Sequence, residues 1–213
     1  MVSIPLYNQR MEKLREPLAD VGPYTWRDFI ELDEDDPREL LDGHLVEIEV
    51  PSLKHERIIH RLTFILEQWA LPRGAGEVLG SGFKVRINDR RAWMPDAQFY
   101  RAGNSPEGQE QGLERGHPDL VIEVISPSSS SKDRVQKRHD YAAIGVPEYW
   151  LIDPEVRILE RQVLRDGAYL MVEPIGGDVV FRPESFEGLE IDLRLLWNAG
   201  VVGASPSGSS QSS

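Results

Sequence analysis

A single glutamate inside an apolar run is the feature of this 213-residue chain that most limits its fold. The run is Asp119-Leu-Val-Ile-Glu-Val-Ile-Ser126, and Glu123 stands near its centre. It is short, rich in β-branched residues and followed by Pro127, which predicts a buried strand. A carboxylate in a buried strand is costly unless a cation or another partner compensates its charge. We therefore expect a partner to hold Glu123, and a metal ion is the leading hypothesis.

A second acid, Asp96, lies in Trp93-Met-Pro-Asp-Ala-Gln-Phe-Tyr100, which also has the composition of a strand. Side chains alternate along a strand, so Asp96 and Gln98 share one face, while Glu123 lies on one face of the other strand. If both faces point into the same cleft, the two carboxylates suit Mg²⁺ or Mn²⁺. The backbone carbonyl of Val124 is then expected to complete the coordination.

A magnesium ion at such a site would bind substrate phosphate oxygens. A cation is therefore also expected near the scissile phosphate, and the segment after Glu123 supplies Lys132, Arg134, Lys137 and Arg138. A helix is predicted from about Lys132 to Ile144, with Gly145 at its end. On it, Lys137 and the accessory candidate Tyr141 are four residues apart and share a surface. We assign Lys137 to the metal site, where it would orient the attacking water or stabilise the pentacovalent phosphorus. A purely surface position for this lysine is an equally good interpretation.

The chain is predicted to comprise an arm (1–24), one α/β domain (25–200) and a Gly/Ser-rich tail (201–213). An Asp42-Gly43 turn predicts a hairpin, and Ser52 precedes a helix over about 55–71. A strand interrupted by Gly80 and Gly82 is predicted over 77–87. Further strands are predicted over 148–153, 156–164 and 168–173, with a last strand and a short connection within 178–193. This order predicts a core with a mixed β-sheet flanked by helices, plus added β-hairpins.

Composition limits the function. The net charge of −12 argues against a general nucleic-acid binder, although a local basic groove remains compatible with it. The chain has no cysteine, so thiolate zinc sites, cysteine nucleophiles and disulfides are excluded. The start lacks a signal-peptide pattern and no apolar run is long enough for a membrane span, so a cytoplasmic protein without membrane contact is expected. A homodimer is expected because the C-terminal hairpins offer apolar edge strands.

An ordered set of motifs resembles the Uma2 family, also called DUF820, of restriction endonuclease-like proteins in the PD-(D/E)XK nuclease superfamily. The set consists of Pro95-Asp96, Glu123-Val-Ile-Ser-Pro127, Lys137 and Tyr141-Ala-Ala-Ile-Gly-Val-Pro-Glu-Tyr-Trp-Leu-Ile-Asp-Pro154. The similarity extends over about residues 25–195. It implies a nuclease-like core, DNA as substrate, and Asp96 and Glu123 as metal ligands. The superfamily pattern places a lysine two residues after the acid, where this chain has Ile125. The resemblance implies that Lys137 replaces it.

Three further residues have two interpretations each. Glu47 precedes the first long helix and is either a third acid or an exposed hairpin residue. His55 opens that helix and either faces the cleft or caps the helix, and Gln98 either supports Asp96 or fills space. Three functions follow as hypotheses: a Mg²⁺-dependent endonuclease, an inactive nuclease-fold module for binding or assembly, and a phosphoesterase for a small nucleotide.

Overall fold

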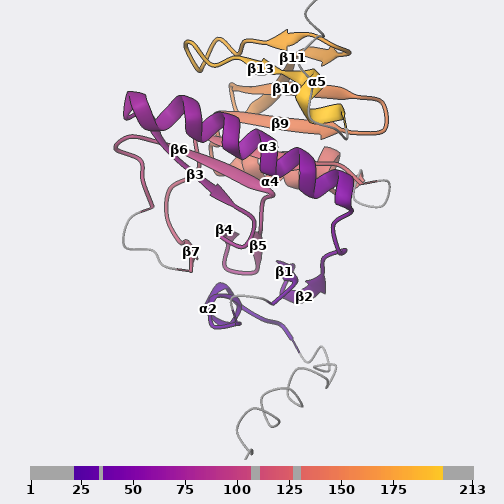
Figure 1. The fold of residues 1–213 in the computed structure, drawn as a ribbon. Helices are drawn as coiled ribbons and strands as arrows, with labels where there is room; N and C mark the ends of the chain where they lie inside the picture. The colour runs from indigo at the N-terminus through magenta and orange to yellow at the C-terminus, as the bar shows by residue number, and fades with distance from the viewer. Residues whose placement is uncertain (1–21, 34–35, 107–110, 127–130, 199–213) are drawn as a thin grey trace, which may run out of the picture.

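The apolar run around Glu123 forms β8 (Leu120–Val124), an inner strand of a six-stranded sheet. From edge to edge the sheet contains β11 (Ala168–Gly176), β10 (Ile158–Arg165), β9 (Glu148–Asp153), β8, β6 (Ala97–Arg101) and β3 (Gly76–Gly80). The β8–β9 pair is parallel and the other pairs are antiparallel, so the sheet is mixed. The predicted α/β core is confirmed. The structure is a computed structural model that describes residues 22–33, 36–106, 111–126 and 131–198 (Figure 1).

Most of the predicted arm and all of the predicted tail lie outside the described residues. Several short elements lie outside the two main sheets and the longer helical segments described below. They are α2 (Trp26–Ile30), η1 (Leu71–Arg73), the pair β12 (Val180–Phe181) and β13 (Ile191–Asp192), and α5 (Leu193–Trp197). The sequence did not predict α5. In the described part of the chain, no helix has the length and apolar character required to cross a membrane.

A second sheet of five strands lies beside the first. Its order is β2 (His44–Glu47), β1 (Arg38–Leu41), β5 (Arg91–Trp93), β4 (Lys84–Asn88) and β7 (Gly112–Leu113). The predicted hairpin is confirmed, because Asp42 and Gly43 both have positive φ, 53° and 84°, as a two-residue hairpin turn requires. This second sheet supplies residues to the site described below.

The chain crosses from one sheet to the other at Pro95. The sequence predicted one strand over 93–100, but β5 ends at Trp93 and β6 begins at Ala97, so that prediction was wrong. Proline has no N–H to donate to a sheet ladder, which explains the break. Asp96 therefore lies at the junction between the sheets, immediately before β6.

Helices cover both faces of the six-stranded sheet (Figure 1). On one face α3 (Leu53–Ala70) packs Leu62 against Phe99 and Ile122 in the main hydrophobic core. Its N-terminus is capped by the Ser52 hydroxyl, which accepts from the His55 backbone N–H. The other face packs against η2 (Lys132–Lys137) and α4 (Arg138–Ala143), which form one continuous helical segment. The hydrogen-bond pattern of η2 is that of a π-helix.

Candidate active site

Asp96 lies immediately before β6, beside the end of β8 that carries Glu123. The β6–β8 pairing ends with Ala97 opposite Ile122, and Asp96 and Glu123 are the next residues of the two segments. The Asp96 Oδ2 atom accepts a hydrogen bond of 2.7 Å from the backbone N–H of Val124. The structure thus brings together the two acids predicted from the sequence, with the Val124 backbone beside them.

Glu123 is almost completely buried, with 3% of its surface exposed. Its Oε1 atom accepts from Lys137 Nζ at 2.9 Å and from the Tyr141 hydroxyl at 3.0 Å. Burial raises the pKa of Glu123 well above its usual value; Lys137 opposes this shift and the nearby carboxylates add to it. The negative charge of the buried Glu123 carboxylate is therefore unfavourable unless a proton or a bound cation neutralises it.

Lys137 lies among carboxylates on all sides. Besides Glu123, its ammonium group lies 3.4 Å from Glu39 Oε1 and 3.6 Å from Asp133 Oδ1. Burial alone lowers the pKa of Lys137, but these carboxylates and Asp96 raise it well above its usual value. Lys137 is therefore a permanently charged group held against the acid of β8.

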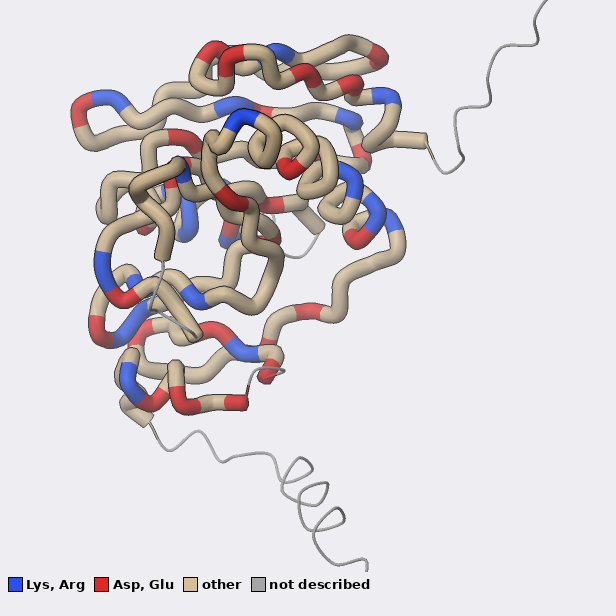
Figure 2. Tube along the Cα trace, turned by 60° about the vertical axis from the view of Figure 1, so that its left-hand side comes forward, with Lys and Arg blue, Asp and Glu red and all other residues tan. Residues whose placement is uncertain are grey.

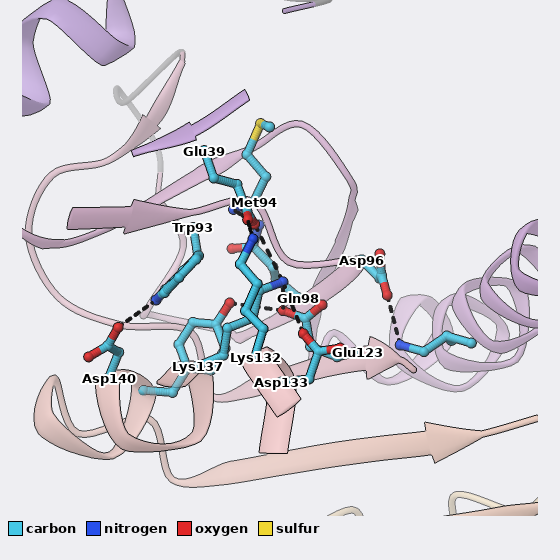
Figure 3. Close-up of polar contacts among 12 residues, drawn as sticks. Glu39, Trp93, Met94, Asp96, Gln98, Glu123, Lys132, Asp133, Lys137 and Asp140 are labelled. Atoms are coloured by element: carbon cyan, nitrogen blue, oxygen red, sulfur yellow. Dashed lines mark hydrogen bonds and ion pairs between the residues drawn. The ribbon is translucent and has the colours of Figure 1, made fainter. Parts of the chain in front are cut away.

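Glu39 and Lys132 complete the arrangement (Figure 3). The sequence offered Lys132 as one of several cations but did not indicate Glu39. Glu39 lies on β1 of the second sheet and is 1% exposed. Its Oε1 accepts from the Met94 backbone N–H at 3.3 Å, and its Oε2 forms an ion pair with Lys132. We call the group the carboxylate–lysine cluster; its members are Glu39, Asp96, Glu123, Asp133, Lys132 and Lys137.

His55 reaches Asp96 from the first turn of α3. Its Nε2 lies 3.0 Å from Asp96 Oδ2, and its Nδ1 lies 3.7 Å from Glu56 Oε1. Burial lowers the pKa of His55, but the Asp96 and Glu56 carboxylates outweigh it and leave the pKa above its usual value. The His55 side chain therefore contacts Asp96, while its backbone N–H donates to the Ser52 cap.

The other two accessory candidates lie elsewhere. Gln98 is fully buried, donates to the Phe83 carbonyl at 2.6 Å and accepts from the Tyr100 hydroxyl at 2.7 Å. Glu47 is exposed on β2, where it stands opposite Arg38. The acid that the hairpin sends to the cluster is therefore Glu39, from the inner strand. Sequence spacing could have suggested Asp133, because it precedes Lys137 by one helical turn.

The charges of the carboxylate–lysine cluster do not balance. Its four carboxyl groups outnumber its two ammonium groups, so acidic groups are in excess. Within the described residues, no three His, Asp or Glu side chains already converge as a metal centre. Mg²⁺ is commonly bound by only one or two carboxylates and keeps several waters, so Asp96, Glu123 and a backbone oxygen form a suitable donor set.

Comparisons with known proteins identify the fold and the family of this chain. A solved structure from Anabaena variabilis ATCC 29413, described as a putative nuclease belonging to DUF820, is similar with a TM-score of 0.68 at 19% identity. The similarity covers 82% of this chain and 98% of that chain, and at this identity it shows a shared fold. No curated protein sequence matches this chain. The model of the Uma2 family, described as putative restriction endonuclease, matches residues 26–194. Because that match covers most of the chain, this protein belongs to the Uma2 family.

Proposed function

We propose that this chain is a divalent-metal-dependent endonuclease that hydrolyses DNA phosphodiester bonds. The observation that carries the proposal is the closeness of Asp96, bound to the Val124 N–H, to the buried Glu123 of β8, with Lys137 bound to Glu123. Membership of a family described as putative restriction endonuclease supports the same reaction class. Mg²⁺ or Mn²⁺ is the proposed cofactor, because both prefer carboxylate, carbonyl and water oxygens.

The metal would be held by the Asp96 and Glu123 carboxylates, together with the carbonyl of Val124. The excess of carboxyl groups over ammonium groups in the cluster favours binding of a cation there. When bound, such an ion neutralises charge that develops on the phosphate and makes water easier to deprotonate.

The chain's own residues have separate tasks. Lys137 presents a fixed positive charge toward the phosphorus that accumulates negative charge during attack. His55 and the Val124 N–H hold the Asp96 carboxylate in one orientation. The Tyr141 hydroxyl on α4 donates to Glu123 and holds that carboxylate in place.

The direct test is cleavage of supercoiled plasmid and single-stranded DNA with Mg²⁺ or Mn²⁺ by wild type, Asp96→Asn and Glu123→Gln. The matched control is Glu148→Gln, because Glu148 is equally buried, at 3%, on the neighbouring strand but pairs with Arg161. We expect metal-dependent cleavage that only the Asp96 and Glu123 substitutions abolish. Equal cleavage by all four proteins would refute the assigned site. Activity confined to a small phosphodiester such as bis(p-nitrophenyl) phosphate would instead indicate a nucleotide phosphoesterase.

A non-catalytic binding module is the second candidate function. It is favoured by the lysine and tyrosine contacts that already occupy Glu123 Oε1. Figure 2 shows Lys and Arg residues interspersed with Asp and Glu residues along the described chain, so phosphate attraction has to come from local groups of cations. DNA binding without cleavage in either metal would support this candidate.

The same proposal includes a homodimer formed through the C-terminal hairpin. Strand β11 is an edge of the six-stranded sheet, and its consecutive residues Leu170, Met171 and Val172 are all more than half exposed. Exposed apolar edge strands favour association. Light scattering after gel filtration measures the mass directly. Substitution of Met171 by Lys is expected to shift a dimer toward monomer, and a wild-type monomer would refute this part of the proposal.

A further inference from the structure

Glu39 holds two ammonium groups at once. Its Oε2 pairs with Lys132 and its Oε1 lies 3.4 Å from Lys137, while the Met94 N–H occupies Oε1 as well. Lys137 already has two other carboxylates, Glu123 and Asp133. A buried glutamate that needed only charge compensation would be satisfied by one lysine. Charge compensation of Glu39 therefore does not by itself explain the second lysine, Lys132.

The π-helical segment is what brings the two lysines together. At 3.6 residues per turn, residues five apart would differ in direction by about 140°. A π-helix has i→i+5 hydrogen bonds, which stack residues five apart on one side. Lys132 and Lys137 are the first and last residues of η2, so its local hydrogen-bond pattern aims both toward β1 and β5. Such π-helical turns are frequent at functional sites.

Trp93 forms a common floor for both ammonium groups. Lys132 Nζ lies 5.1 Å and Lys137 Nζ 5.6 Å from the centroid of its ring. The indole is fixed by its Nε1, which donates to Asp140 at 2.9 Å. Two like charges over one ring repel each other, and the shared Glu39 carboxylate offsets this repulsion. The Trp93 ring and the Glu39 carboxylate therefore hold the two ammonium groups together as a pair of cations.

The two lysines differ in access. The Lys137 side chain is 8% exposed and is enclosed by acids, whereas the Lys132 side chain is 25% exposed. Lys132 can therefore meet a ligand from solvent without breaking the buried contacts of Lys137. Lys132 is the more accessible of the two ammonium groups, so its positive charge offsets the nearby acids on the side from which a phosphodiester can approach.

We propose that Lys132 binds a non-bridging phosphate oxygen of the substrate, and that Glu39 is a positioning residue that keeps Lys132 beside Lys137. This inference rests on the proposed nuclease function and adds a substrate-binding residue to it. The contrasting interpretation is that the Lys132–Glu39 pair only attaches η2 to β1.

The experiment compares wild type with Lys132→Met and the matched control Arg134→Met. Arg134 lies on the same segment, is 34% exposed and also pairs with carboxylates, those of Glu160 and Asp153, outside the cluster. Binding of a labelled DNA duplex is measured by fluorescence anisotropy with Ca²⁺ at several salt concentrations, and cleavage with Mg²⁺ in parallel. We expect Lys132→Met to weaken binding about tenfold or more, to raise KM more than it lowers kcat, and to reduce the salt slope by about one.

Glu39→Gln separates positioning from attachment. If Glu39 positions both lysines, this variant raises KM and lowers kcat together, and Lys132→Arg retains most of the affinity that Lys132→Met loses. A Lys132→Met protein that binds and cleaves like wild type, or one that only loses thermal stability as Arg134→Met does, would overturn the inference while leaving the nuclease proposal intact. Wild-type protein that neither binds nor cleaves DNA would overturn both.

Discussion

The ammonium group of Lys137 lies 2.9 Å from Glu123 Oε1, although fourteen residues separate the two in sequence. The position two residues after Glu123, where the superfamily pattern has its lysine, holds Ile125. That side chain is 5% exposed and packs in the core cluster of Tyr141 and Tyr149. Glu123 and Ile125 share a face that packs against η2 and α4. A lysine on this helical segment can therefore place its ammonium group where a lysine at position 125 would place it.

Lys137→Met is expected to lower both stability and activity. The substitution leaves three buried carboxylates without their shared cation, which costs about 3–5 kcal/mol of unfolding free energy in the absence of metal. A divalent cation would restore part of that loss, because it supplies the missing positive charge. Urea unfolding with and without Mg²⁺ measures both effects, and cleavage is expected to fall about 10²–10³-fold.

Lys84→Met is the control for this prediction. Lys84 is also a buried lysine, at 3% exposure, but it donates to the Phe29 carbonyl at 2.9 Å, away from the acids. Its loss should lower stability equally with and without Mg²⁺. If Lys137→Met behaved in the same metal-independent way, Lys137 would be a structural lysine.

His55→Ala is expected to weaken metal binding without unfolding the protein. The side chain orients Asp96 through the 3.0 Å contact, and loss of such a supporting contact typically costs about 10–100-fold in metal affinity. Calorimetric titration with Mn²⁺ measures the affinity. His60→Ala, an exposed position on the same helix, serves as the control and should bind metal like wild type. Identical affinities for the two variants would remove His55 from the site.

Glu123 was predictable because it stands in a strand whose pattern is unambiguous, whereas Asp96 lies at the junction between β5 and β6, where the sequence predicted a continuous strand. The apolar residues around Glu123 predict β8, and a charged residue at its centre has few physical explanations. The Asp42-Gly43 turn and the capped start of α3 depend on local interactions, which is why the sequence predicted them as well. Local turn and cap chemistry does not depend on the rest of the fold.

The second sheet and the π-helical turn were not predictable in the same way. Glu39 and Glu47 belong to one hairpin, and only the pairing of β1 with β5 makes Glu39 the inner, buried acid. That pairing is a long-range contact. Residues three and four apart share a face in an α-helix, so ordinary helical spacing separates Lys132 from Lys137 and conceals the pair.

Glu47→Gln therefore offers a sharp contrast with Glu39→Gln. Glu47 is exposed on the edge strand β2, so its substitution should change the unfolding free energy by less than about 0.5 kcal/mol and leave cleavage unchanged. Removal of the Glu39 charge disturbs two buried ion pairs and should affect both quantities. Parallel urea unfolding and plasmid cleavage distinguish the two acids. A loss of cleavage in the Glu47 variant would restore the third-acid hypothesis for that residue.

The alkaline limit of stability should be set by buried tyrosines. Four of the six tyrosines in the chain, Tyr100, Tyr141, Tyr149 and Tyr169, are buried, and burial raises the pKa of each above its usual value. The folded state keeps these hydroxyls neutral while the unfolded chain ionises them near pH 10, so stability is lost as the pH rises above about 10. An ultraviolet titration should therefore show four tyrosinate groups appearing only together with the loss of circular dichroism. If all six tyrosines ionised near pH 10 while the circular dichroism stayed native, the packing of these four side chains would have to be revised, including the hydrogen bond from Tyr141 to Glu123.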